Sequence, residues 1–504
     1  MAGPIEIMSP SKGWIQQALQ VSSGSKAVFH AIVALSSANL AMASIQHPTF
    51  AGLHKPEKYY SDALDQYSKT IAALNHQIRG VMEGCAPLEP VLLTCLLLMC
   101  YELHAERSSM AIRHHTMGYD IVKKHLSDRN QGAVHSSNHQ DSLQQLADAF
   151  AKLAVGSNYP SGDHDPIAET DRSAQQLVIP QRVPQALRLS DVWDQLDRLI
   201  DAGNALCSRL YHFTAQHVAA IYGGSLDQAT RYCLASCWSR SIELPVHDTI
   251  LLEISHLLSA HRQWLAVISG VQNSDRKAAR ALALLQIRQW MSSFTLATCR
   301  QTRETCMDAH EADFNRVLDL AQLYLKLDTL APRPIPPRNM YGNGQDDAFC
   351  LEEGILSPLY LISLKSRRSA TRHRAVDILA SANRREGLGS STISAQIALA
   401  IVRVEEERAK NLAPTLLATE LLSDRVPEAA RFTDTVRAAG EDLYRPTCRL
   451  ICARYLHESD GVIELTEYLS KGPCFPYSKC AGKCRTGFHF KTVKEARYKV
   501  FAPS

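Results

Sequence analysis

Hydrophobic positions along this chain recur every three or four residues in most segments, and no run of strict alternation long enough for a sheet stands out. The clearest stripe lies in residues 57–80, where Gly80 marks the end of the pattern. Its apolar members are Tyr60, Leu64, Tyr67, Ile71, Leu74 and Ile78. This spacing predicts an amphipathic helix.

Three neighbouring segments, residues 27–46, 91–101 and about 106–126, are predicted to be helices as well. Pro48 ends the first of them, because proline moves the preceding residue away from the α region. The apolar run at 91–101 is about half of the roughly 20 residues needed to cross a bilayer. We therefore expect a buried core helix there, and short connections that make successive helices antiparallel neighbours.

Polar or proline-rich interruptions near residues 127–140, 156–185 and 331–347 divide the chain into helical blocks. We therefore expect an all-α protein, built from stacked antiparallel helix pairs that form one large helical domain over residues 14–470. Residues 471–504 are rich in Lys, Cys, Gly and Phe with weak periodicity. They are predicted to form a tail of uncertain order.

The composition is that of a soluble globular protein, with 45% hydrophobic and 21% charged residues. A net charge of +3 spread over 504 residues gives little overall field, so any basic surface must be local. Most cysteines lie inside apolar helical runs, where we expect reduced thiols. The first residues, MAGPIEIMSPSKGW, show no basic segment leading into a hydrophobic run, and no secretory signal is expected.

Sequence motifs for catalysis are absent: the chain contains no phosphate-binding loop, no Gly-x-Ser-x-Gly elbow and no His-Glu-x-x-His pair. We therefore expect no enzyme and no cofactor. Weak candidates for a zinc site are Cys474, Cys480, Cys484 and His489. Their spacing matches no known knuckle or ribbon, so no metal site is predicted.

A basic stretch, KSRRSATRHR, carries weak candidates for nucleic-acid contact or nuclear import. They are Lys365, Arg367, Arg368, Arg372 and Arg374. The apolar residues Val376, Ile378 and Leu379 that follow require burial, so we expect Arg372 and its basic neighbours to form the solvated face of a helix.

Several motifs resemble the helical regulatory domain of fungal zinc-cluster transcription factors. The distal ones are GILSPLYLISLKSRRSATRHRAVDILASANRREGL and AQIALAIVRVEEER. In that family an apolar helix, a basic helix, an Arg-Arg-Glu-Gly turn and a helix ending in paired glutamates follow one another. Here they match residues 358–365, 367–379, 384–387 and 402–407. Proximal motifs YYSDALDQYSKTIAALN, VLLTCLLLMCYELHAERSSMAIRHHTMGYDIV and LADAFAKL keep the same order, so the resemblance runs from about residue 27 to 455.

The resemblance implies a nuclear regulator of transcription, shuttling with the cytoplasm and acting on a metabolic gene set. Its implied partners are other transcription factors or a second copy of the chain, bound through helical surfaces, with no membrane involved. The family reads DNA through a six-cysteine zinc module, C-x2-C-x6-C repeated, but the first cysteine here is Cys85 and no later group has this spacing. We therefore expect no zinc, and indirect DNA contact through a DNA-binding partner.

Two alternatives stay open at the level of sequence. The helix pairs are equally compatible with a helical-repeat-like scaffold or adaptor unrelated to transcription. The chain can also be the truncated product of a gene whose upstream sequence encodes the zinc module.

Overall fold

A computed structural model describes most of the chain, in the following segments: residues 13–46, 56–105, 108–129, 142–143, 146–147, 149–150, 189–241, 246–269, 276–329, 348–350, 354–386, 389–412, 425–439, 447–456, 462–471 and 491–499. The chain divides into two compact units. Unit 1 comprises residues 1–157, 332–353 and 383–390, and unit 2 comprises 158–331, 354–382 and 391–504. The fold is largely helical, as predicted.

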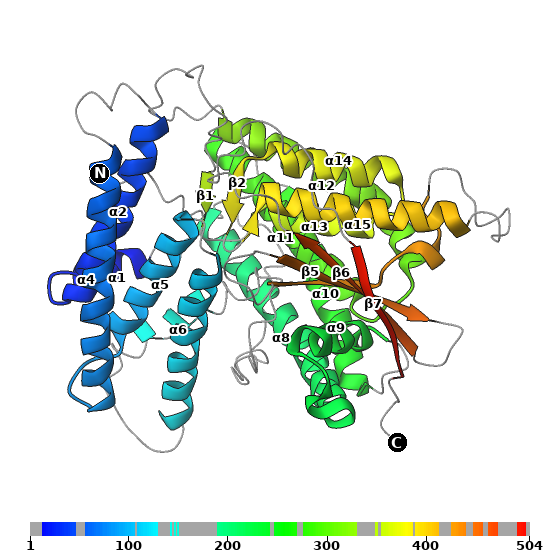
Figure 1. Ribbon diagram of the computed structural model, residues 1–504. Coiled ribbons are helices and arrows are strands. Elements are labelled where there is room, and N and C mark those ends of the chain that lie inside the picture. The colour runs from blue at the N-terminus through cyan, green and yellow to red at the C-terminus, as the bar shows by residue number, and fades with distance from the viewer. Residues whose placement is uncertain are drawn as a thin grey trace. The chain divides into compact units, whose positions relative to one another are not determined.

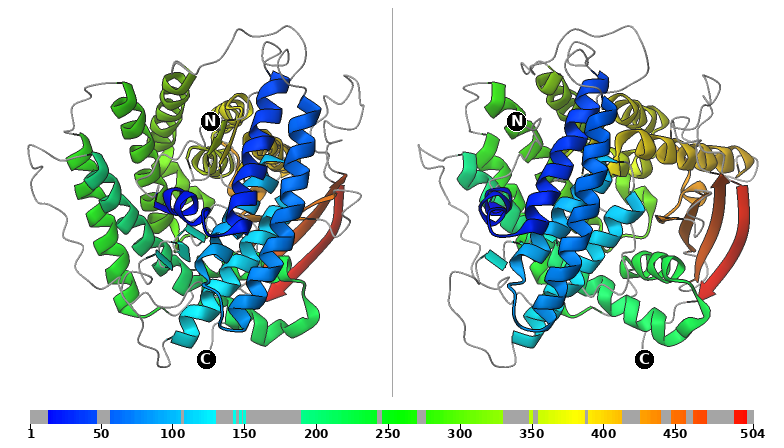
Figure 2. Two further views of the ribbon diagram at one scale, coloured as in Figure 1. Left: turned by 90° about the vertical axis from the view of Figure 1, so that its left-hand side faces the viewer. Right: turned by 60° about the vertical axis from the view of Figure 1, so that its left-hand side comes forward.

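Unit 1 is built around a helical hairpin. Its helices are α1 (Gly13–Val21), α2 (Lys26–Gln46), α4 (Pro56–Met82), α5 (Glu89–His104) and α6 (Ser108–Arg129). The long helices α2 and α4 lie side by side in every view (Figures 1 and 2). Polar contacts join them where Gln77 Nε2 donates to Ser25 Oγ at 2.7 Å and His30 Nδ1 meets Gln66 Oε1 at 2.7 Å. The four helices predicted from periodicity are confirmed within a few residues at each end.

The helix α5 forms the core of unit 1, because its apolar residues surround the whole helix rather than one stripe. Leu92, Leu93, Leu96, Leu98 and Met99 are all fully buried. No helix in the described residues combines the length and apolarity that a membrane span requires. The predicted role of 91–101 as a core helix is confirmed.

Unit 2 contains the remaining helices. They are α8 (Leu189–Tyr222), α9 (Gln228–Ser239), α10 (Asp248–Ser269), α11 (Arg276–Thr298), α12 (Glu311–Thr329), α13 (Leu356–Lys365), α14 (Ser369–Ser381) and α15 (Ser391–Leu412), with short 3-10 turns η1 (Gly223–Ser225), η2 (Glu304–His310) and η4 (Glu428–Ala430). Large aromatic residues anchor their packing: Trp264 Nε1 donates to the Val192 carbonyl at 3.3 Å, and Trp290 stacks on Phe294. Trp238, Trp264 and Trp290 are all buried.

Unit 2 also contains a four-stranded antiparallel sheet that the hydrophobic pattern did not predict. Its strands, in spatial order, are β4 (Asp434–Ala439), β5 (Thr447–Leu456), β6 (Val462–Lys471) and β7 (Lys491–Lys499). The long pair β5–β6 runs in register from Thr447 opposite Lys471 to Leu456 opposite Val462. β7 lies in the segment expected to be a tail of uncertain order, and it pairs with β6.

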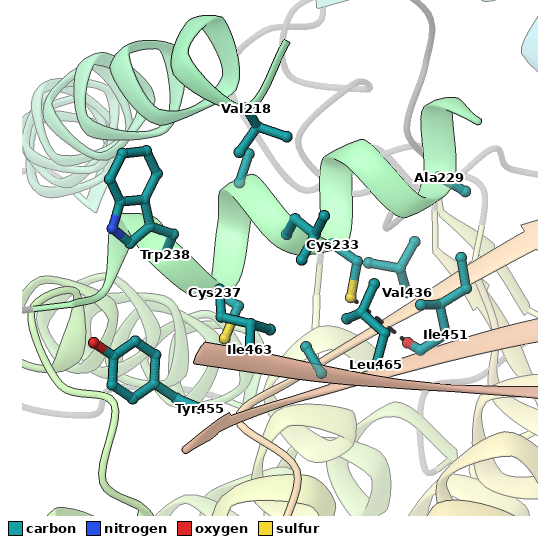
Figure 3. Packing of buried hydrophobic residues seen from close by; sticks show 13 residues of the cluster. Val218, Ala229, Cys233, Cys237, Trp238, Val436, Ile451, Tyr455, Ile463 and Leu465 are labelled. Carbon is teal, nitrogen blue, oxygen red and sulfur yellow. Dashed lines mark hydrogen bonds between the residues drawn. The ribbon is translucent and has the colours of Figure 1, made fainter. Parts of the chain in front are cut away.

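Helices cover both faces of this sheet, which explains why alternation was hidden. On β5, Ile451, Ala453 and Tyr455 face α9, whose Cys233 and Cys237 point toward the strands in Figure 3. The intervening Leu450 and Cys452 pack instead with residues of α13 and α15. A strand buried on both faces is a continuous apolar run, which periodicity alone cannot distinguish from a short core helix.

Unit 1 has a small sheet made of β1 (Ala348–Cys350), β2 (Arg384–Glu386) and β3 (Gly389–Ser390). β1 pairs in parallel with β2, and β2 is antiparallel to β3. The expected Arg-Arg-Glu-Gly turn is therefore wrong for residues 384–386, which form a strand. Asn383, between the end of α14 and the start of β2, has a φ of 45°, in the left-handed region that asparagine tolerates.

Some predicted segments cannot be compared. The polar interruptions at 156–185 and 331–347, and residues 130–140 of the first one, lie outside the described residues. Residues 127–129 of that interruption belong to the last turn of α6.

The packing of α6 in unit 1 leads to the first prediction. A Cβ atom at Gly118 would overlap with Cζ of Phe150, a fully buried ring. Gly118→Ala should therefore lower stability, because overpacking costs about 1–3 kcal/mol and the helix propensity of alanine returns only about 1 kcal/mol. Gly24→Ala is the matched control, since its Cβ would meet nothing nearer than 3.9 Å. Thermal unfolding of both variants checks this, and equal melting temperatures would contradict the packing.

Candidate functional site: a buried ion-pair network in unit 2

The basic segment predicted to face solvent is the centre of a buried charge network. Arg372 on α14 is 0% exposed. Its Nη2 donates to the Glu405 carboxylate on α15, and its Nε donates to the Ser363 carbonyl at 3.0 Å. The expectation that Arg372 forms a solvated face is therefore wrong. Its guanidinium group can be buried because it forms an ion pair with the buried Glu405 carboxylate.

Glu405 binds two guanidinium groups at once. Its Oε2 also accepts from Arg431 Nη1 at 2.8 Å, while its Oε1 accepts the backbone N–H of Phe432 at 2.7 Å. Both Glu405 and Arg431 are almost fully buried. Loss of hydration, followed by the neighbouring Arg431 charge, lowers the pKa of Arg372 to about 10. Arg372 therefore stays charged near neutral pH, despite its burial.

A second carboxylate, Glu304, extends the network to α13. Lys365 Nζ donates to Glu304 Oε1 and to the Thr433 carbonyl, each at 2.7 Å. Arg431 Nη2 lies 3.5 Å from the other oxygen of Glu304. Burial lowers the pKa of Lys365, and the Glu304 carboxylate acts against this shift. Cations and carboxylates are thus interleaved across α13, α14, α15 and η2.

The rim of the network is partly open to water. Arg367 Nη1 and Arg425 Nη1 both bind Asp308 Oδ2, at 2.7 Å and 2.9 Å. The Glu428 carboxylate accepts the backbone N–H groups of Glu304 at 2.8 Å and Thr305 at 2.7 Å, so it caps the start of η2. Burial raises the pKa of Glu428.

The five basic candidates of the sequence separate into two groups. Lys365, Arg367 and Arg372 are buried, and each forms an ion pair with a carboxylate inside unit 2. Arg368 is exposed, and Arg374 is partly exposed with its Nη2 at 2.5 Å from Asp319 Oδ1. Only these last two present charge that a phosphate or an import receptor could meet, and their role there stays a prediction.

The acidic partners of the network were missed at the sequence level. A usable signal exists for Glu405, which follows the buried Ile397 and Ile401 at intervals of four on α15. Arg372 likewise precedes the buried Val376 by four residues on α14. A charge in the apolar register of a helix indicates a buried ion pair. Arg431 lies between a 3-10 turn and a strand, and no periodicity points to it.

No group of three or more metal-ligating side chains occurs within the segments that the structure describes. The weak zinc candidates Cys474, Cys480, Cys484 and His489 lie outside those segments. Each interaction described above joins side chains or backbone groups of unit 2 to one another.

The fold is largely helical, and comparison with known proteins finds a family match for part of the chain. Residues 5–191 match the fungal specific transcription factor domain. The family resemblance predicted from the motifs is thus confirmed over the segment that carries α1 to α6. The distal motifs at 358–407 lie beyond the matched residues.

The chain is also similar to the Aspercryptin biosynthesis cluster-specific transcription regulator atnN of Emericella nidulans. The two are 35% identical over 100 residues, which are 20% of this chain and 15% of that protein. The match therefore spans a small part of the length of that relative. No solved structure matches the chain.

The network leads to the second prediction. Glu405→Gln should destabilise unit 2 by about 3–5 kcal/mol, because it leaves Arg372 and Arg431 buried without the carboxylate they share. Arg374→Gln on α14, the helix that also carries Arg372, is the control. It removes an ion pair whose Asp319 is 70% exposed, and pairs of this kind contribute about 0–1 kcal/mol.

Urea unfolding followed by far-UV circular dichroism measures both variants. Equal midpoints for Glu405→Gln and Arg374→Gln would show that the buried network contributes no stability.

Proposed function

We propose that this protein regulates transcription from the nucleus through its helical domain, as a regulator rather than an enzyme. The observation that carries the proposal is the match of residues 5–191 to the fungal specific transcription factor domain. The similarity to a protein named as a cluster-specific transcription regulator supports the same class, and it favours a metabolic gene set as the target.

The chain contacts DNA through a partner in this proposal. A net charge of +3 provides little attraction for phosphates, and much of the basic segment is neutralised inside unit 2. Base discrimination also requires a rigid element placed in a groove. The six-cysteine pattern that supplies this element in zinc-cluster factors does not occur in the sequence.

The partner is a zinc-cluster transcription factor or a second copy of the chain, bound through helical surfaces. The matched segment provides apolar side chains for such contacts: Tyr60 and Leu64, one turn apart on α4, are 53% and 36% exposed. Amphipathic helices dock on other helical proteins through anchors with this spacing.

The third prediction concerns DNA binding. The purified full chain should show no sequence preference on promoter DNA at physiological salt, and it should recover promoter fragments once a zinc-cluster factor is added. Electrophoretic mobility shifts with and without the factor measure this. Nanomolar, sequence-specific binding by the chain alone would contradict the proposal and direct attention to Arg368 and Arg374.

The same assay tests the exposed apolar surface of α4. Leu64→Glu places a charge among the exposed apolar residues of α4 and should weaken recovery of promoter fragments at least tenfold. Asn75→Glu, at an exposed position three turns along the same helix, is the matched control and should leave recovery unchanged. Equal recovery with both variants would exclude this face of α4 as the contact.

The fourth prediction separates a regulator from a helical scaffold unrelated to transcription. A tagged full chain should be found in the nucleus, with a cytoplasmic fraction, and its deletion should change the transcription of a group of metabolic genes. Fluorescence microscopy and transcript sequencing measure these results. Exclusion from the nucleus under all growth conditions, with an unchanged transcriptome, would establish the scaffold alternative instead.

A further inference from the structure

Two cysteines from distant parts of the sequence meet inside unit 2. Cys207 lies on α8, and Cys299 directly follows the last residue of α11. The two helices approach closely beside them, because Gly203 has no side chain and a Cβ there would lie 3.3 Å from Leu296 Cδ1. Cys207 is one turn beyond Gly203, and Cys299 is three residues beyond Leu296, so both sulfurs lie next to this contact.

The two sulfurs interact directly. Cys207 and Cys299 form a side-chain hydrogen bond with each other, and Cys299 Sγ also lies 3.1 Å from the Leu296 carbonyl oxygen. Both are free thiols and both are only partly buried, unlike Cys233 and Cys237 in the sheet core. The residues of this pair are therefore less deeply buried than the thiols of the sheet core.

The surroundings of the pair distinguish the two thiols. The hydrogen bond from Cys207 lowers the pKa of Cys299, and the positive charges of Arg300 and Arg240 lower it further, against the effect of burial. The same hydrogen bond raises the pKa of Cys207. Because the thiolate is the nucleophile, these directions favour Cys299 as the attacking sulfur and Cys207 as the resolving one.

We propose that Cys207 and Cys299 form a redox-active dithiol, which a hydroperoxide converts into a disulfide joining α8 to α11. In the first step the Cys299 thiolate attacks the distal oxygen of the peroxide, the O–O bond breaks, and a sulfenic acid and an alkoxide form. The alkoxide takes a proton and leaves as an alcohol, or as water when hydrogen peroxide is the oxidant.

In the second step the Cys207 sulfur attacks the sulfur of the sulfenic acid. The S–S bond forms, the S–O bond breaks, and the thiol proton leaves with the hydroxide as a molecule of water. Both cysteines are oxidised and the peroxide is reduced. A reduced dithiol reverses the reaction by thiol–disulfide exchange.

The test uses the reduced full chain and hydrogen peroxide. After oxidation, free thiols are blocked and the chain is digested without reductant, and mass spectrometry should find the peptides of Cys207 and Cys299 joined. Dithiothreitol should separate them. This arm needs no variant, so it does not depend on the folding of a mutant.

Variants then assign the roles. Cys299→Ser should abolish the joined peptide, and Cys207→Ser should leave a Cys299 sulfenic acid that dimedone traps. Cys85→Ser is the matched control, because Cys85 is an exposed thiol in unit 1, and it should leave the joined peptide unchanged. Circular dichroism confirms that the variants keep their helices.

A second probe reports on geometry without oxidation. Phenylarsine oxide binds two neighbouring thiols as a cyclic dithioarsinite and releases water. It should protect Cys207 and Cys299 together from alkylation. Oxidation that consumes thiols without joining these two peptides, or arsenical protection that persists in Cys299→Ser, would overturn the proposal. Neither result bears on the regulation of transcription, which is tested separately above.

Discussion

The Glu405 carboxylate, held between two buried guanidinium groups, is the interaction on which the arrangement of unit 2 depends. It receives Arg372 from α14 and Arg431 from the segment before β4, and it also accepts the backbone N–H of Phe432. Phe432 in turn packs with Leu364 of α13 and Ile401 of α15 beneath the sheet. This one carboxylate therefore holds α14, α15 and the segment before β4 together, at the point where the chain passes from helices into strands.

An ion pair of this kind costs hydration on both sides, and an apolar substitute of similar shape is often as stable. In unit 2 the ion pair instead determines which groups can pack against residue 405. A hydrophobic residue at 405 would accept many neighbours, whereas Glu405 requires two guanidinium groups and one N–H in fixed positions. Because Lys365 and Glu304 continue the same alternation of charge, a shift of α13 against η2 would break an ion pair between two buried groups.

The helices of unit 1 could be predicted from sequence because each carries its own signal. Residues 57–80 show a stripe and an end at Gly80, and the core helix at 91–101 is uniformly apolar. The sheet could not be predicted, since β5 alternates between two covered faces and so shows no alternation of apolar and polar residues. The site was also misread for a physical reason. Arg372 looks solvated in isolation, and only the long-range approach of Glu405 makes its burial possible.

The same reasoning changes how the basic segment bears on function. A count of Lys and Arg in KSRRSATRHR indicates an electrostatic surface, but electrostatic attraction to phosphates depends on charge that water can reach. Lys365, Arg367 and Arg372 form ion pairs with carboxylates inside unit 2. Of the five basic candidates, Arg368 and Arg374 are therefore the ones whose charge water can reach. The segment that matches the transcription factor domain, residues 5–191, is also separate from this network in the sequence. The basic stretch is therefore explained by the folding of unit 2, and the proposed contacts with partners rest on the helices of the matched segment.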